Sequence, residues 1–255
     1  MSDRALQDLV IRALADAPFR QSPGWRQRAL ADADRVEQFA RFLARHYYFE
    51  RIVHFFKYSA ALSGVTGRRP EAVLGQPPFD ALRPALVLGS RDSARAVAAL
   101  VVAHVKSGRP SAPIPYHADL LRYEESMMVV EAGPRVWRET GSGERGAEAA
   151  PETVEGTALL DLAYDLPVVL PKLLRPWTTV PEAPPQAVRL IIARSRYGRV
   201  AVAKATDAIV SIMELADGRK TLEDLAREAG LRPAELQATL QGLTELGAVR
   251  FSTGS

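Results

Sequence analysis

The chain has 255 residues, of which 47% are apolar and 25% are charged, and its formal net charge is +3. These are the values of an ordinary globular chain, and so small an excess of positive charge does not by itself indicate nucleic acid. The absence of cysteine excludes disulfides, cysteine-ligated zinc, iron–sulfur clusters and thiol catalysis.

The first residues, MSDRALQDLVIRALADAP, lack the cationic start and unbroken apolar core of a secretory signal. No apolar run reaches the roughly 20 residues that a membrane-spanning helix needs. We therefore expect a cytoplasmic protein without a membrane partner.

Most of residues 1–126 shows helical patterns, and we expect this part of the chain to form a helical domain. Apolar side chains recur at helical spacing over Ala5–Ala17, and Ser90 is placed to cap a helix that ends at Ser107-Gly108. The longest pattern, from about Asp32 to Leu62, predicts one long helix. It is apolar on more than one side, which is typical of a central bundle helix touched by neighbours on several faces.

His46, Glu50 and His54 fall one helical turn apart in this long pattern. They could supply half of a metal site, which would make the chain a metalloenzyme. The alternative is a ladder of hydrogen bonds or ion pairs in a packed bundle. Because the chain has four histidines and no second helix of this kind, we expect no metal here.

Other signs of catalysis are missing from the sequence. It contains no glycine-rich phosphate loop, nucleophile elbow or His-Glu zinc motif. Glu124 and Glu125 are adjacent and point to different sides of a helix, so they cannot face each other as an acid–base pair. We therefore expect no catalytic residue and no cofactor on this chain.

The composition changes at Met127, and residues 127–185 are expected to form a β-containing middle segment and linker. The stretch MMVVEAGPRVWRE is rich in β-branched and aromatic residues around Gly133-Pro134, which predicts strands. Residues 140–156 are rich in Gly, Glu and Ala and predict a loop. A strand is expected in ALLDLAYDLPVV, and the prolines of residues 180–186 indicate a tether.

Residues 186–255 have the element order of a winged helix. Two runs over residues 188–203 alternate with period two around Tyr197-Gly198, which predicts a hairpin. Three helical patterns follow, with Thr221 placed to cap the second and Pro233 to begin the third. We therefore expect an α+β chain with an N-terminal helical domain, a β-containing middle and a winged-helix-like C-terminal module.

Such a module can read DNA with its third helix or bind a peptide along its hairpin edge. A helix in the major groove needs cations and base-reading side chains, and this third helix has no Lys or Arg between Arg232 and Arg250. Peptide binding is therefore the first interpretation. A winged-helix DNA-binding transcriptional regulator is the alternative, and we do not expect nucleic acid as a partner.

An edge strand carries unpaired main-chain groups to which an extended peptide can add as a further strand. The second hairpin strand leads into the first helix, and the third helix can wall a groove beside it. Val200 and Val202 could equally be ordinary core, and the helical domain around residues 47–58 is the other place where a peptide could lie. The predicted peptide-binding positions are Val200, Val202, Lys204, Gln237 and Gln241.

The stretch GRVAVAKATDAIVSIMELADGRKTLEDLA resembles the peptide chaperone of pyrroloquinoline quinone biosynthesis and related peptide-recognition elements. This resemblance implies that the C-terminal module recognises a peptide. The positions that carry it are Asp217, Gly218, Thr221, Glu223 and Leu225.

Most of the chain resembles bacterial accessory proteins of ribosomal-peptide natural-product pathways. The segments that carry this resemblance are RHYYFERIVHFFKYSAAL, ALVLGSRDSA, SARAVAALVVAHV and IPYHADLLRYEESMMVVE, with Pro115, Tyr116, Asp119, Leu120, Tyr123 and Glu124 as matching positions. These proteins are partners of multinuclear non-haem iron oxygenases with a TIM-barrel fold, including those used in making methanobactin and 3-thiaglutamate.

The second resemblance implies a non-catalytic subunit that holds a precursor or carrier peptide and presents it to the iron enzyme. Iron is then expected in the partner enzyme of a heterodimer and not on this chain. The positions expected at the partner interface are Tyr47, Arg51, Tyr58 and Tyr123.

Overall fold

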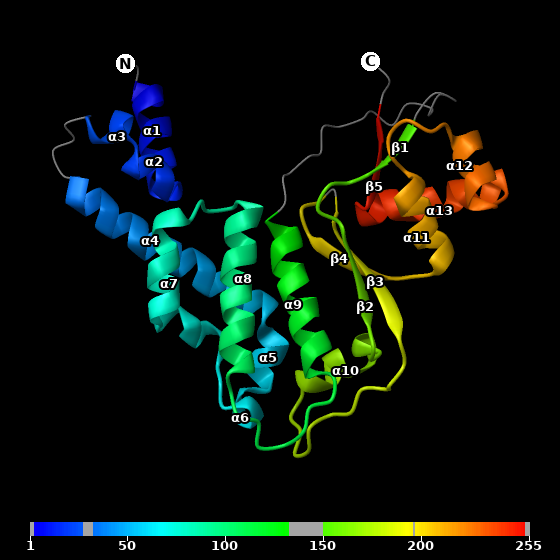
Figure 1. Ribbon diagram of the computed structural model, residues 1–255, viewed down its shortest axis with the longest axis horizontal. Helices are drawn as coiled ribbons and strands as arrows, with labels where there is room; N and C mark the ends of the chain where they lie inside the picture. Colours follow the sequence, from blue (N-terminus) through cyan, green and yellow to red (C-terminus); the bar gives the residue numbers. More distant parts are fainter. Residues whose placement is uncertain (1–2, 28–32, 133–149, 196, 253–255) are drawn as a thin grey trace. The chain divides into compact units, whose positions relative to one another are not determined.

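The structure, a computed structural model, describes residues 3–27, 33–132, 150–195 and 197–252 (Figure 1). The chain is mixed α+β and divides into two compact units. The first contains Met1–Ala132 and Leu170–Pro181, and the second contains Gly133–Val169 and Glu182–Ser255. The segment expected to form a separate middle part is thus shared between the two units.

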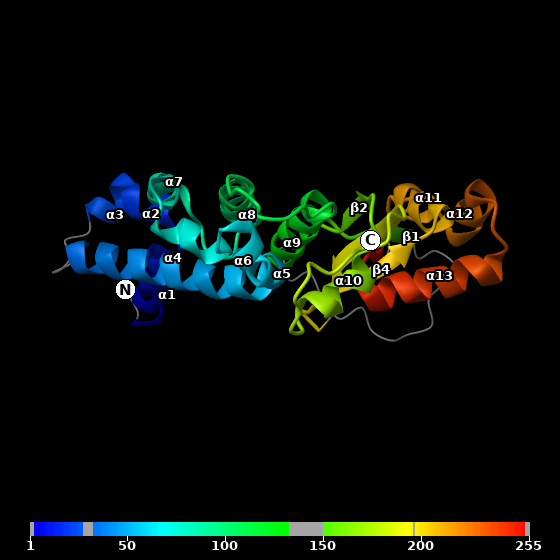
Figure 2. The same cartoon turned by 90° about the horizontal axis from the view of Figure 1, so that it is seen from below.

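The first unit is helical. Its long elements are α4 (Ala33–Phe55), α8 (Arg91–Lys106) and α9 (His117–Glu131), and α8 and α9 lie side by side (Figure 1). Figure 2 shows α4 on one side of this unit and α8 on the other. The short elements are α1 (Asp3–Ala15), α2 (Ala17–Gln21), α3 (Pro23–Arg26), α5 (Lys57–Ala61), α6 (Ser63–Thr66), η1 (Pro70–Gly75), α7 (Pro77–Leu82) and η2 (Arg83–Ala85).

The single helix predicted over residues 32–62 is interrupted at Phe56, which has φ −98° and ψ 30°. The cause lies in α9, far away in the sequence. Glu124 is fully buried, and its Oε1 accepts hydrogen bonds from the N–H groups of Tyr58 (2.8 Å) and Ser59 (3.1 Å). The Ser59 hydroxyl donates to Oε2. Glu124 therefore caps α5, which has no side-chain cap of its own.

Several elements contact α4, namely α1, α5, η1, α8 and α9, but the expectation that neighbours cover all of its apolar sides is wrong. Its core face carries Ala40, Ala44, Tyr48 and Ile52, which are buried. The second apolar side, with Phe39, Phe42, Phe49 and Val53, is exposed.

The strands predicted from Met127 onward are wrong as far as the structure describes them, because α9 continues to Glu131. Met128 and Val130 are buried. Tertiary packing of this apolar face outweighs the modest preference of valine for strands. The predicted Gly133-Pro134 turn and the rest of the stretch lie outside the described residues.

The second unit holds two small antiparallel sheets. In one, β2 (Ala158–Leu162), β3 (Val188–Arg194) and β4 (Val200–Ala205) lie in that order. In the other, β1 (Ala150–Thr153) pairs with β5 (Val249–Ser252). The strand in ALLDLAYDLPVV and the hairpin are confirmed, and α10 (Leu166–Leu173) follows β2 in the chain.

The loop predicted over residues 140–156 is wrong for β1, and residues 140–149 lie outside the described part. Tertiary contacts hold β1 extended in addition to its pairing with β5. The Thr153 hydroxyl donates to the Met213 carbonyl (2.6 Å), and the Arg250 guanidinium contacts the Glu152 carboxylate (2.8 Å). The middle segment therefore supplies a strand to the C-terminal module.

The three predicted C-terminal helices are present as α11 (Asp207–Leu215), α12 (Leu222–Ala229) and α13 (Pro233–Leu246). Their termini follow the sequence signals. Thr221 accepts the Asp224 N–H as N-cap, and Gly230 and Gly247 end α12 and α13 in the left-handed conformation.

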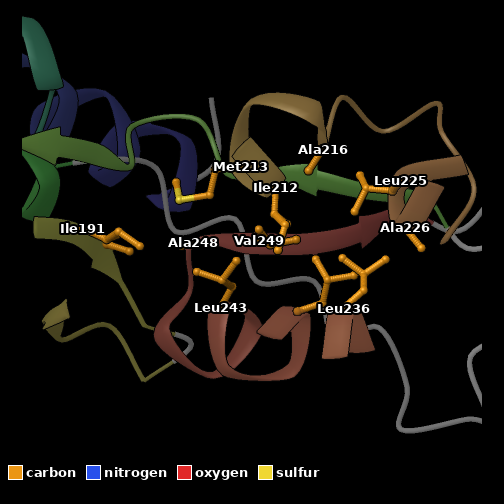
Figure 3. Close-up of a cluster of buried hydrophobic side chains, with 12 residues drawn as sticks. Ile191, Ile212, Met213, Ala216, Leu225, Ala226, Leu236, Leu243, Ala248 and Val249 are labelled. Carbon is orange, nitrogen blue, oxygen red and sulfur yellow. The ribbon is translucent and has the colours of Figure 1, made fainter. Parts of the chain in front are cut away.

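A hydrophobic core joins these helices to β3 and β5 (Figure 3). Each fully buried Leu or Ile side chain contributes about 1.5–3 kcal/mol of transfer free energy, so this cluster stabilises the second unit substantially. The core residues are Ile191, Ala193, Ile212, Met213, Ala216, Leu225, Ala226, Leu236, Leu240, Leu243, Ala248 and Val249.

Among the described residues, no helix combines the length and apolarity needed to cross a membrane.

Candidate peptide-binding site

Two main-chain hydrogen bonds hold the turn of the β3–β4 hairpin and determine how the two strands pair. The Gly198 N–H donates to the Ser195 carbonyl, and the Ser195 N–H donates to the Arg199 carbonyl, both at 2.8 Å. Gly198 has φ +76°. This is the arrangement of a three-residue hairpin loop with a glycine bulge, in which Ser195 and Arg199 form a hydrogen-bonded pair.

The pairing register then determines which main-chain groups of β4 face away from β3. Hydrogen-bonded and non-hydrogen-bonded pairs alternate along an antiparallel ladder. Counting from the Ser195–Arg199 pair, Ala201 and Ala203 are bonded to β3, whereas Val200, Val202 and Lys204 are in non-bonded pairs. Their N–H and C=O groups therefore point to the outer edge of β4.

No further strand pairs with this edge within the described part of the chain, since β4 ends the order β2-β3-β4. Beyond the strand ladder, the hydrogen bonds of the described residues include none from the main chain of Val200, Val202 or Lys204. The structure thus brings these three predicted residues together as one row of main-chain donors and acceptors. We call this row the β4 edge.

The side chains of β4 divide between the two faces of the sheet. Ile191 and Ala193 belong to the core with α11–α13, and their cross-strand partners are Ala203 and Ala201. The alanines of β4 therefore face the helices, and Val200 and Val202 face the opposite side. Both valines are half-buried, so they are not fully buried core residues.

The predicted groove set does not converge on one face, which corrects the sequence interpretation. α13 packs against β4 on the helix-facing side and buries Leu236, Leu240 and Leu243. Gln237 and Gln241 are exposed on this helix, across the sheet from the side chains of Val200, Val202 and Lys204. The alternation VAVAKA in the sequence contained the missed signal, because the small residues mark the side where α13 lies close to the strand.

Lys204 has a structural contact that the sequence did not reveal. Its Nζ lies 2.7 Å from Oδ2 of Asp165, whose side chain is 8% exposed. The other oxygen of Asp165, Oδ1, is buried and has no hydrogen bond among the described residues. The Lys204 side chain thus pairs with a buried carboxylate, and its main chain is what remains available at the β4 edge.

In the helical unit, three of the four predicted partner-interface residues keep exposed surface. Tyr47, Arg51 and Tyr58 are half-buried. The Arg51 guanidinium lies 3.4 Å from the centre of the Tyr47 ring, and its Nε lies 3.3 Å from the Glu131 carboxylate. Arg51 therefore joins α4 to α9 by a cation–π contact and an ion pair.

Tyr123 does not fit the predicted interface. Only 7% of it is exposed, which leaves almost no surface for a partner. Burial, together with the neighbouring Tyr58 and Glu124, raises the pKa of Tyr123 to about 12. This side chain belongs to the interior around Glu124, and its helical spacing alone could not distinguish that position from the surface.

The three residues considered for a metal do not gather into a site. The His46 ring stacks on Phe42, and its Nε2 lies 3.3 Å from Glu50, while His54 packs edge-on against Phe55. Over residues 3–27, 33–132, 150–195 and 197–252, no group of three or more His, Asp or Glu side chains is arranged to hold a metal ion.

The exposed side of α13 is neutral to acidic. Glu235, Gln237, Gln241 and Glu245 are exposed, and Arg232, just before the helix, pairs with Glu235. A surface of this charge does not attract phosphates.

A scan against protein-family models and a search of curated proteins both find no match for the chain.

Proposed function

We propose that this chain is a non-catalytic peptide-binding subunit that takes up an extended segment of a precursor or carrier peptide as an added strand on the β4 edge. The observation that carries the proposal is the row of outward-facing main-chain groups on Val200, Val202 and Lys204. Each residue offers one N–H and one C=O, the groups that strand addition uses for affinity.

The surroundings of the β4 edge give the added strand a basis for specificity. Alternate side chains of a bound peptide would point toward α13, past Ala201 and Ala203. The other side chains would lie beside Val200 and Val202 on the opposite face. The order of hairpin, three helices and returning strand supports the interpretation of this unit as a winged-helix-like peptide-recognition module.

The larger role that we propose is presentation of the bound peptide to an iron-dependent TIM-barrel oxygenase, with the metal on the partner. The basis is the resemblance of the chain to accessory proteins of ribosomal-peptide pathways, together with the exposed surface of Tyr47, Arg51 and Tyr58. Co-expression with such an oxygenase followed by affinity purification tests this role separately, because a peptide can bind without the oxygenase.

Val202→Pro tests the peptide site. The lost N–H faces outward, so the ladder to β3 survives, since proline is tolerated on edge strands. Peptides selected from a displayed random library provide the ligand, and their Kd by fluorescence anisotropy should rise at least about tenfold, which corresponds to one lost hydrogen bond of about 1.4 kcal/mol.

Two control variants show whether a loss of affinity in Val202→Pro comes from the missing N–H. Val202→Thr keeps both main-chain groups and should bind peptide nearly as the parent does. Ala203→Pro removes a donor to Ile191 and should lower the stability of the second unit instead. If no peptide is selected, or if Val202→Pro binds as well as Val202→Thr, the peptide does not add to the β4 edge.

A further inference from the structure

The exposed side of α4 carries a continuous apolar stripe, formed by Phe39, Phe42, His46, Phe49 and Val53. The intervals between these residues alternate between three and four, which places all five on one face of the helix. Phe39, Phe42, Phe49 and Val53 are 49%, 61%, 45% and 47% exposed. The rings stack along the helix, with 6.3 Å between the centroids of Phe39 and Phe42 and 6.0 Å between those of Phe42 and His46.

The stripe is not the core face of a loosely packed helix. Ala40, Ala44, Tyr48 and Ile52 form a separate buried face. Helical geometry, at about 100° per residue, puts that face nearly opposite the stripe. An exposed run of aromatic rings on an otherwise well-packed helix marks an interaction surface.

We propose that a second copy of this chain covers the stripe, with the two α4 helices side by side and parallel. The 3-4 spacing is that of positions a and d in a two-helix seam, and such a seam is complementary to itself about a twofold axis. Phe39, His46 and Val53 are then a positions, and Phe42 and Phe49 are d positions.

The charges beside the stripe select the parallel direction. Arg45 and Glu50 take the g and e positions, and a parallel pair brings each g residue to the e residue five places on in the other helix. Arg45 of each copy thus meets Glu50 of the other. An antiparallel pair would instead place g beside g and e beside e, bringing like charges together.

Both groups are available for these contacts. Arg45 is exposed and forms no ion pair in the part of the chain that the structure describes. Glu50 is also exposed, and it contacts His46 of its own helix.

The exposed area of the four apolar side chains is roughly 300–400 Å². It is smaller than the ~800 Å² per partner of a standard interface. We therefore expect a weak dimer, with Kd on the order of 10 µM.

The first test is the mass of the full chain by sedimentation equilibrium between 1 and 200 µM protein. The mass should rise from 27.8 kDa toward twice that value. Phe42→Glu and Phe49→Glu should each keep it monomeric at every concentration without changing the circular dichroism spectrum, because both side chains are exposed. Leu174→Glu is the control, since Leu174 is 51% exposed in the same unit but lies outside the stripe.

Charge exchange tests the register. Arg45→Glu and Glu50→Arg should each weaken the dimer roughly tenfold, because each change turns two attractive contacts into repulsive ones. The double variant Arg45→Glu/Glu50→Arg should recover dimerisation, and so should a mixture of the two single variants.

The absence of cysteine in the chain allows a clean test of direction. Phe49→Cys alone should form an intermolecular disulfide under mild oxidation, because equivalent d positions face each other in a parallel pair. Cross-linking only when Phe39→Cys and Phe49→Cys are mixed would mean antiparallel pairing, in which a positions face d positions, and would overturn the proposal. So would a wild-type chain that stays monomeric at 200 µM, a dimer indifferent to Phe42→Glu, or a stripe needed only for assembly with a different protein.

Discussion

No described element covers the α4 stripe or pairs with the β4 edge, but these two surfaces expose different kinds of group. The α4 stripe offers aromatic side chains, whereas the β4 edge offers main-chain N–H and C=O groups. A seam of side chains depends on the identity of each residue, so a single Phe→Glu change should abolish its binding. An edge strand depends mainly on backbone geometry, so it should tolerate side-chain changes and fail on substitution by proline.

This difference shows why the two surfaces must be tested with different substitutions. Alanine scanning would find the α4 stripe and miss the β4 edge, because alanine keeps every main-chain donor and acceptor. The two surfaces also belong to different compact units, so a change that weakens one unit should leave the other surface functional.

The largest expected effect is a pH dependence confined to the helical unit. Burial raises the pKa of Glu124 to about 8, although the hydrogen bonds from Ser59 and Tyr58 oppose the shift. The folded state therefore holds a proton that the unfolded state releases near the ordinary value of 4.5. This contribution to stability is fully present below pH 4.5 and is lost as the pH rises through about 8.

Over that interval the free energy of unfolding should fall by about 1.4 kcal/mol per pH unit. Urea denaturation at a series of pH values, monitored by tryptophan fluorescence, measures this slope. Glu124→Gln should remove most of the slope, because a neutral amide can still accept the two N–H groups and hydrogen-bond to Ser59. Peptide binding at the β4 edge should show no corresponding change. An equally steep slope in the Gln variant would assign the pH dependence to another group.

The second prediction concerns the stability of the second unit. Gly247 has φ +89°, and a Cβ there would lie 2.2 Å from the Arg194 carbonyl oxygen. Gly247→Ala should therefore cost about 3 kcal/mol or more through strain and collision, and it should abolish peptide binding while the α4 dimer persists.

Gly242→Ala is the matched control in the same helix. A Cβ at this position meets nothing within 4 Å, so alanine should stabilise α13 by about 0.5–1 kcal/mol. Thermal unfolding of both variants measures the difference. If the two variants have the same melting temperature, α13 does not approach β3 as closely as the structure shows.

The third prediction separates the side chain of Lys204 from its main chain. Lys204→Met leaves the Asp165 carboxylate buried without its cation. We expect a loss of about 1–2 kcal/mol, at the low end for a buried pair because the Lys204 side chain is 55% exposed. Lys172→Met, at an exposed lysine, should have no effect on denaturation. Peptide affinity should hardly change at temperatures where the Met variant is folded, and a large loss would assign the Lys204 side chain to the binding site.

The smallest expected effect concerns DNA. With neutral and acidic side chains on the exposed side of α13, binding to a labelled duplex should be weak and should disappear between 50 and 200 mM salt. Anisotropy titrations at several salt concentrations measure it. A sequence-specific complex that resists salt would favour the alternative of a transcriptional regulator.

The sequence by itself determined much of the second unit. The Tyr197-Gly198 turn, the Thr221 cap, and the ends of α12 and α13 at Gly230 and Gly247 all lie where local signals place them. These features depend on a few neighbouring residues, because a turn or cap is decided by local dihedral angles and one or two hydrogen bonds. The register of a short closed hairpin follows from them, so the row formed by Val200, Val202 and Lys204 could be predicted.

Only the tertiary structure decided features that depend on partners distant in the sequence. The break at Phe56 needs Glu124 from α9, the strand β1 needs β5, and the face of the sheet on which α13 packs needs the shared core. The exposure of Phe39 and Phe42 was also beyond the sequence pattern. Helical periodicity marks an apolar side equally whether a neighbouring element covers it or leaves it open, and the presence of that neighbour is set by the packing of the whole unit.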